Sequence, residues 1–270
     1  MPSLPSGFVF SQSSLQDYTD CARRFELRYL QRLQWPAVES EPALENERRQ
    51  QEGQLFHRLV QQHLIGIPEE RLTRLAASAD LRRWWNNYRA QPLSLDDYAK
   101  YTEATLSAPL GAFRLLAKYD LIAMQPGQRA VIYDWKTYAK RPRNEWMAAR
   151  LQTRVYRALL VRAGAHLNGG TPIPPHQVEM IYWYADYPAE PARFTYSLAQ
   201  YERDWAGLEK LAEEIAAAQA FPPTEDEKRC AFCVYRSYCE RGVHAGQGGE
   251  AESELSEPEI DLEQIQEIAF

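Results

Sequence analysis

Long apolar stretches are missing from this 270-residue sequence. No run approaches the roughly 20 consecutive apolar residues that a membrane-spanning helix requires. The first residues also lack the basic and then apolar order of a secretory signal. These two absences exclude the usual sequence marks of a membrane or exported protein. We therefore expect a soluble, cytoplasmic chain that has no membrane partner.

Cysteine is also scarce, with four residues in the whole chain. Thiols stay reduced in the cytoplasm, so a disulfide framework is not expected. Cys230, Cys233 and Cys239 form a C-x₂-C-x₅-C pattern, and Cys21 lies far upstream. Such a pattern is typical of a soft-metal site, because thiolates favour zinc and iron–sulfur clusters. The spacing alone leaves both occupants open.

Positive charge is absent from residues 243–270, which carry eight Asp and Glu residues and no Lys or Arg. Without those eight charges, the formal net charge of −6 becomes +2 for the remainder. The acidic total therefore does not exclude nucleic-acid binding by the body, which depends on Lys and Arg near phosphate. We expect one domain over residues 1–243 and an acidic, disordered tail over 244–270, with a short partner-binding helix at 260–270 as the alternative.

Helical and extended patterns alternate along the body and predict one mixed α/β domain with a helical insertion. One expected helix carries an apolar stripe of Leu55, Leu59, Val60 and Leu64, with His57 beside it. The other expected helices cover Ser11–Leu33, Leu72–Tyr98, Asn144–Arg162 and Leu198–Ala220, and the expected strands cover Thr102–Leu106, Phe113–Ile122, Ala130–Tyr138 and Val178–Tyr184.

Charged residues occur near the ends of two expected strands. Asp120 lies in one of these strands, and Asp134 and Lys136 lie in the next. Because alternate residues of a strand share a face, Asp134 and Lys136 project together while Trp135 projects to the other side. Phosphodiester hydrolysis requires carboxylates that bind hard divalent cations and a positive charge beside the phosphate. The set indicates this chemistry.

Each of these residues also has a structural interpretation. Asp134 and Lys136 can form a simple ion pair at a strand end, and Asp120 can cap a turn. A lone histidine such as His57 on an amphipathic helix is more often structural than a metal ligand. Their combination, in order and on the expected elements, favours the chemical interpretation.

The ordered set resembles the PD-(D/E)XK nuclease superfamily over residues 8–240. Gly53 with His57 is similar to the Gly-x-x-x-His helix of that family, and Asp120 ends a segment similar to the strand of its first catalytic acid. Asp134-Trp135-Lys136 resembles the (D/E)XK motif itself. The resemblance implies a restriction-endonuclease-like fold, a mixed sheet flanked by helices.

The same resemblance implies roles for the site residues. His57, Asp120 and Asp134 would bind one or two Mg²⁺ or Mn²⁺ ions. Lys136 would orient the attacking water or stabilise charge. Gln152 and Tyr156, which match the QxxxY motif of the family, would contact the substrate.

The four cysteines resemble those of the RecB-like branch, including the CRISPR-associated adaptation exonucleases and the nuclease domain of AddB. This likeness implies a [4Fe–4S] cluster, with zinc as the alternative occupant. The cluster would sit in a lobe built from the N-terminal helix and residues 222–243, where it is held by Cys21, Cys230, Cys233 and Cys239.

The relatives imply a metal-dependent exonuclease that acts on single-stranded DNA or DNA ends. Repair, recombination and CRISPR adaptation are the implied settings, with a helicase or an adaptation protein as partner. One alternative is a catalytically silent DNA-binding subunit of a helicase–nuclease complex, which the departure Ala117-Lys118 from the usual Gly-Arg supports. Another is a zinc-stabilised interaction protein, which leaves the ordered catalytic set unexplained.

Overall fold

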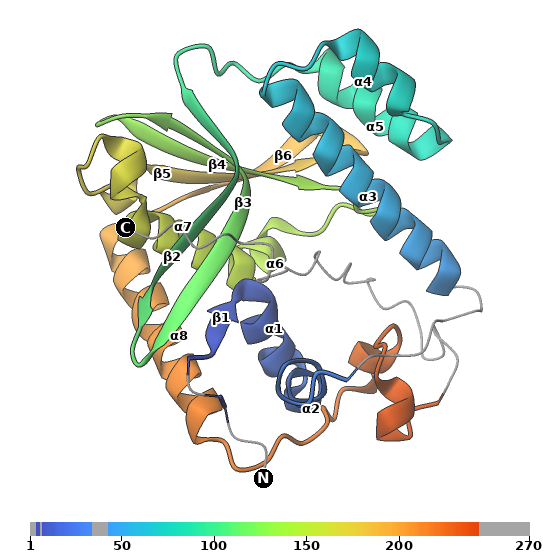
Figure 1. Cartoon of the computed structure of the whole chain (residues 1–270), viewed down its shortest axis with the longest axis vertical. Helices are drawn as coiled ribbons and strands as arrows, with labels where there is room; N and C mark the ends of the chain where they lie inside the picture. Colours follow the sequence, from blue (N-terminus) through green and yellow to red (C-terminus); the bar gives the residue numbers. More distant parts are fainter. Residues whose placement is uncertain (1–3, 6, 34–42, 243–270) are drawn as a thin grey trace.

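A mixed β-sheet forms the centre of the protein in its computed structural model (Figure 1). The structure describes residues 4, 5, 7–33 and 43–242. The tail expected over 244–270 lies outside the described residues. The β1–β3 and β4–β5 pairs are parallel, and the other pairs are antiparallel. The expected mixed α/β fold is confirmed. The sheet order is β1 (Val9–Ser11), β3 (Phe113–Gln125), β4 (Arg129–Lys136), β5 (Val178–Tyr184) and β6 (Tyr187–Thr195), and β2 (Ala99–Leu110) also pairs with β3.

Strand β3 has neighbours on both edges. Strand β2 pairs with it along nearly its whole length. The other edge is therefore shared, because β1 pairs with residues 114–116 and β4 with residues 121–125. Asp120 lies between these two paired segments. The sheet thus forks beside Asp120, where β1 has ended and β4 has not yet joined.

Helices cover both faces of the sheet. On one face, α1 (Gln12–Asp20), α7 (Leu151–Ala163) and α8 (Leu198–Ala217) pack in the larger core cluster. On the other face, α3 (Ala43–Leu64), α4 (Glu69–Leu75) and α5 (Ala79–Ala90) pack in the second cluster (Figure 1). All seven residues of β5 are buried, because this central strand is covered on both sides.

The helical insertion was predicted, but the buried face of α3 and the number of helices after it were predicted incorrectly. Trp84, Trp85 and Tyr88 are buried as expected. Leu55 was expected in the buried stripe of α3 but is 47% exposed, and the adjacent Phe56 is fully buried in its place. The expected single helix over 72–98 is divided into α4 and α5, with a Ser78 side-chain cap at the start of α5.

The first expected helix is also divided. Residues 9–11 form β1, and Ser11 then caps α1 with a reciprocal capping box. Cys21 takes an extended conformation (φ −162°, ψ 105°) and separates α1 from α2 (Ala22–Phe25) and the π-helical turn Glu26–Leu30. The extended residue lets its thiol accept a hydrogen bond from the Thr224 N–H, at 3.4 Å.

The helix predicted over 144–162 contains a break at Arg150, whose ψ of 144° is incompatible with a helix. The break separates α6 (Asn144–Ala149) from α7. Arg143, not Asn144, occupies the N-cap position of α6. Strand β6 was not predicted. The remaining short helical turns are Gly164–Asn168, Pro175–Gln177, Glu227–Cys230 and Arg236–Cys239.

In the described part of the chain, no helix combines the length and the apolar character that a membrane crossing needs.

The turn between β5 and β6 is held to the helical insertion by one carboxylate. Asp186 accepts hydrogen bonds from the Arg49 guanidinium at 2.9 Å, from Arg83 at 2.8 Å and from the Trp84 indole at 2.9 Å. Arg49 also lies over the Trp84 ring, 5.2 Å from its centroid. These contacts fix α3 and α5 against the end of the sheet.

We expect Asp186→Ala to lower the free energy of unfolding by about 1–3 kcal/mol, because it leaves the buried Trp84 indole N–H and the partly buried Arg49 guanidinium without their shared acceptor. Urea denaturation measures this change. Asp97→Ala is the matched control, because Asp97 is exposed and should change stability by less than about 0.5 kcal/mol. Equal effects of the two substitutions would show that the three donors find other partners.

Candidate active site

Asp120 is held at the fork of the sheet by two donors. Its Oδ2 accepts a hydrogen bond from the Trp135 backbone N–H at 2.8 Å. Its Oδ1 lies 3.2 Å from His57 Nδ1, which α3 brings to the same point. The carboxylate thereby accepts a hydrogen bond from a backbone N–H of β4. In a continuous sheet, that N–H would bond to a backbone carbonyl of the neighbouring strand.

Asp134 and Lys136 project from β4 to one face, and Trp135 is buried in the second cluster on the other, as alternation predicts. Lys136 Nζ lies 3.0 Å from Asp134 Oδ2. Both residues are buried, at 3% and 6% exposure respectively. The pair is therefore not the solvated surface pair that its sequence also allowed. Buried charges of this kind require partners, and each supplies one for the other.

At this site, burial and the neighbouring charges shift the pKa values of Asp120 and His57 in opposite directions. Burial raises the pKa of Asp120, but the His57 charge and hydrogen bond, the Trp135 N–H and Lys136 outweigh it, so the pKa lies below the usual value. Burial lowers the pKa of His57, but Asp120 and then Asp134 reverse the direction and the pKa is raised. The site thus favours an ionised Asp120 in contact with positive charge.

Gln152 extends from α7 to Asp134. Its Nε2 donates to Asp134 Oδ1 at 2.8 Å, and its Oε1 accepts from the Tyr182 hydroxyl at 3.2 Å. Tyr182 is itself 2.8 Å from Thr153 Oγ1, which donates to the Met147 carbonyl at 2.5 Å. This buried chain fixes the direction of the amide. Tyr182 is a site residue that the sequence did not single out, although it lies beside Asp134 in the β4–β5 register.

Tyr156 lies one turn after Gln152 and is likewise buried, with 4% of its surface exposed. Its hydroxyl donates to the Lys118 carbonyl at 2.8 Å, and its ring centroid lies 4.7 Å from that of Tyr119. These contacts support β3 just before Asp120. The structure therefore brings Tyr156 beside β3, the strand of Asp120, and its predicted contact with substrate stays a prediction.

Gly53 allows α3 to approach the end of β4. A Cβ atom at this position would lie 2.9 Å from Oγ1 of the buried Thr137. Arg49, one turn earlier, donates from Nε to the Thr137 carbonyl at 2.9 Å. Because Gly53 has no side chain, α3 can lie close enough to β4 for His57, one turn later, to meet Asp120.

The donors at this site suit a hard divalent cation. Two carboxylates and an imidazole interact electrostatically here, and oxygen and nitrogen ligands of this kind bind Mg²⁺ or Mn²⁺. The carboxylate oxygens already face positive or hydrogen-bond-donating groups. Across residues 4, 5, 7–33 and 43–242, however, no three His, Cys, Asp or Glu side chains lie close enough together to hold one ion.

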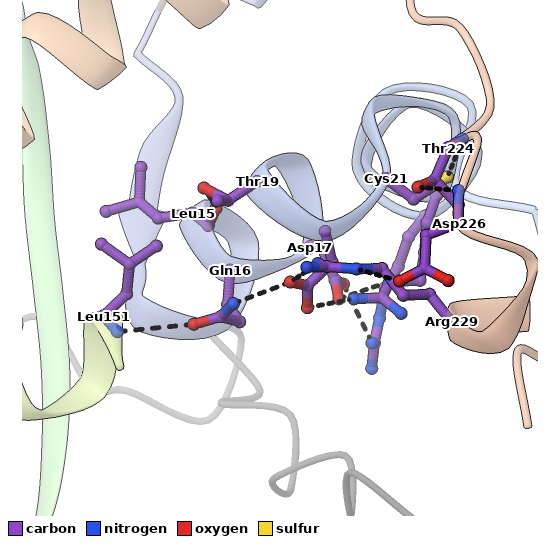
Figure 2. Close-up of polar contacts among 12 residues, drawn as sticks. Leu15, Gln16, Asp17, Thr19, Cys21, Leu151, Thr224, Asp226 and Arg229 are labelled. Carbon is purple, nitrogen blue, oxygen red and sulfur yellow. Dashed lines mark hydrogen bonds and ion pairs between the residues drawn. The ribbon is translucent and has the colours of Figure 1, made fainter. Parts of the chain in front are cut away.

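A second group of donors lies where the C-terminal segment meets α1 and α2. Figure 2 shows the Thr224 N–H directed at Cys21 and Arg229 beside the end of α1. Arg229 forms an ion pair with Asp20. The two ends of the described chain are thus joined at the position where the sequence predicted a cysteine lobe.

The four thiols lie in one region of the described structure, but no three of them come close enough together to hold one metal ion. Cys21 interacts electrostatically with Cys230, Cys233 and Cys239. Burial is the main cause that raises the pKa of all three C-terminal thiols, and it brings that of Cys233 to about 11. A soft metal at this group would have to displace protons, as thiolate ligands require. The residue types therefore fit zinc or an iron–sulfur cluster.

The family model of the PD-(D/E)XK nuclease superfamily matches residues 9–240. The chain belongs to this superfamily. The match spans the fork at Asp120, the Asp134–Lys136 pair and all four cysteines. No curated protein matches the sequence.

Two solved structures are similar in outline. The crystal structure of SSO0001 has a TM-score of 0.41 and 12% identity, covering 87% of each chain. A structure from Eubacterium rectale, named for an unproven exonuclease activity, has a TM-score of 0.49 and 9% identity, covering 80% of this chain and 84% of that one. Neither likeness bears on the substrate of this chain.

We expect Gly53→Ala to destabilise the protein. The same change inside an ordinary helix stabilises by about 0.5–1 kcal/mol, but here the new Cβ meets Thr137 Oγ1. In a Thr137→Ala background the contact is removed, so Gly53→Ala should regain its usual stabilising effect. Thermal unfolding of the four variants of this cycle measures the coupling. An equal effect in both backgrounds would show that α3 shifts without cost.

Proposed function

We propose that the protein is a metal-dependent DNA nuclease, acting as an exonuclease on single-stranded DNA or DNA ends. The observation that carries this proposal is the buried Asp134–Lys136 pair, 3.0 Å apart, beside Asp120 at the fork of the sheet. A buried cation paired with one carboxylate, next to the strand that carries a second carboxylate, favours chemistry on a phosphodiester. Membership of a nuclease superfamily supports the same conclusion.

His57, Asp120 and Asp134 would hold Mg²⁺ or Mn²⁺. The bound ion would supply a water of lowered pKa and stabilise negative charge on the phosphate. The Trp135 N–H keeps Asp120 in place, and the Gln152 amide does the same for Asp134. These two hydrogen bonds orient the carboxylates, a role that donors around a metal site commonly fill.

Lys136 is the residue that would act on the reacting groups. Its ammonium lies over the rings of Tyr138 and Tyr182, at 5.8 and 5.4 Å from their centroids, as well as beside Asp134. These neighbours stabilise the charged form in a buried position. Lys136 would orient the attacking water or stabilise charge that develops on the phosphate.

The four cysteines would hold a [4Fe–4S] cluster, with zinc as the less favoured occupant. The mutual interaction of Cys21 with the three C-terminal thiols and the Thr224 N–H directed at Cys21 support a shared ligand. Its role would be structural, since it joins segments distant in sequence. The protein would then belong to the RecB-like branch. It would act in the cytoplasm, in repair, recombination or CRISPR adaptation. Its partner would be a helicase or an adaptation protein.

A catalytically silent, DNA-binding subunit of a helicase–nuclease complex is the second candidate. It is favoured by Lys118, which stands where similar nucleases usually carry Arg and whose ammonium forms an ion pair with Glu103. An ion-paired lysine offers less positive charge to the substrate than a free arginine would.

We expect Mg²⁺ or Mn²⁺ to support degradation of end-labelled DNA, and EDTA to abolish it. Asp134→Ala should remove activity, because a metal ligand is lost. Lys136→Ala should lower kcat by about 10²–10³, the usual effect of removing one charge-stabilising group. Lys100→Ala, a change of an exposed lysine, is the matched control. Circular dichroism checks that each variant is folded.

Wild-type protein that binds DNA but cuts neither single-stranded nor duplex substrates with either metal would favour the DNA-binding subunit. Cleavage that persists in Asp134→Ala would place the active site elsewhere.

Anaerobically purified protein should be brown, with a broad absorbance band near roughly 400 nm and about four irons per chain. Cys230→Ala should lower the thermal stability, because the ligand set joins the chain ends. Metal analysis that finds zinc and no iron would retire the cluster. Unchanged stability of Cys230→Ala would contradict the structural role.

A further inference from the structure

A cavity of about 470 Å³ lies beside the first turn of α7. Residues of α1, α6, α7, α8 and the 3₁₀ turn Glu227–Cys230 line it. Its volume is within the range of about 300–1,000 Å³ of small-molecule sites. Gln16 and Leu151 form part of the wall, where Leu151 N donates to Gln16 Oε1 at 3.4 Å (Figure 2). The next residue, Gln152, binds Asp134, so the first turn of α7 carries both a wall of the cavity and a residue of the candidate active site.

Positive charge predominates in the lining. Four cations and two acids line the cavity, and one of the acids, Asp20, is paired with both Arg24 and Arg229. The helix α7 begins here without a side-chain cap, so its N-terminal N–H groups add to the positive potential. The four cations of the lining are Arg150, Arg154, Lys210 and Arg229.

Lys210 is the cation of the lining best placed to bind a ligand. It is exposed, and no acid of the described chain forms an ion pair with it. Arg154, in contrast, binds Asp204 through Nε at 2.9 Å. Gly207 leaves room for the rest of that guanidinium, since a Cβ there would lie 2.8 Å from Arg154 Nη2. The space beside α8 thus depends on a missing side chain.

An aromatic ring completes the cavity. Trp146 is half-buried, and the Arg150 guanidinium lies over it at 4.7 Å from the ring centroid. Aromatic rings and arginine planes are the surfaces on which unpaired bases stack, with cations tracking the phosphates. An indole beside several cations therefore matches a nucleotide better than a purely anionic or purely apolar ligand.

We propose that this cavity binds one nucleotide unit of a single DNA strand, with its phosphate at Lys210 and the arginines and its base at Trp146. The inference rests on the proposed nuclease function and adds to it a strand-holding site outside the group of acids. A strand held there would pass the first turn of α7 on its way to Asp134.

The test measures binding of a fluorescein-labelled oligothymidylate of 12 nucleotides to the full chain in EDTA, where no cleavage occurs. Trp146→Ala should weaken binding by about 5- to 100-fold, the range expected for losing one stacked base. Lys210→Glu should also weaken binding, and more strongly at low than at high salt, because it removes a phosphate-binding charge. Trp146→Phe keeps a stacking ring and should retain most of the affinity. Lys100→Glu makes the same charge change outside the cavity and should have a much smaller effect.

A second readout separates this site from the chemistry. Hydrolysis of bis(p-nitrophenyl) phosphate with Mn²⁺ needs the acids but not the cavity, so both cavity variants should match wild type. Weakened strand binding in the variants supports the proposal whether or not the protein is a nuclease. If wild type hydrolyses neither DNA nor bis(p-nitrophenyl) phosphate, only the proposed nuclease function fails. Unchanged strand binding in Lys210→Glu and Trp146→Ala overturns the proposal, as does an equal loss in Lys100→Glu.

A free mononucleotide has the same chemistry as a strand unit. Titration with thymidine monophosphate distinguishes them. Binding of the monophosphate that is lost in Trp146→Ala, while oligothymidylate binding is unchanged, would overturn the assignment to a strand. Loss of strand binding in the variants, with weak binding of the monophosphate throughout, is the expected result.

Discussion

The hydrogen bond from the Trp135 N–H to Asp120 is the constraint on which the site depends. One edge of β3 must serve both β1 and β4, and Asp120 lies where neither strand is paired with it. A backbone group left open at such a fork needs an acceptor, and the carboxylate supplies it. The acid of one strand is thereby tied to the main chain of the next, between Asp134 and Lys136.

Around this fork, each helix contributes through a specific close approach. The gap left by Gly53 lets α3 bring His57 to Asp120, and the buried amide of Gln152 fixes Asp134 from α7. The two helices lie on opposite faces of the sheet, so residues from both layers contact the acids of the site. Buried polar groups that satisfy one another in this way also specify a single arrangement.

Periodicity in the sequence was sufficient for the elements that carry the site. The alternation around Trp135 placed Asp134 and Lys136 on one face, and β5 was predicted with its bounds. Breaks at Cys21 and Arg150 were missed, because no local Gly or Pro marks them; the Cys21 thiol meets the distant Thr224, and the Leu151 N–H just after Arg150 meets Gln16. Nor could local pattern indicate the cavity beside α7, whose walls come from five separate elements.

The docking of the C-terminal segment on α1 has a consequence for how the chain is made. Cys21 meets Thr224 across some two hundred intervening residues, so this contact cannot form until residue 224 has been synthesised. Contacts of such long separation carry a large loop-closure entropy and form late in folding. A chain interrupted before residue 224 could still pair β1 with β3, but it would leave the end of its first helix without this support.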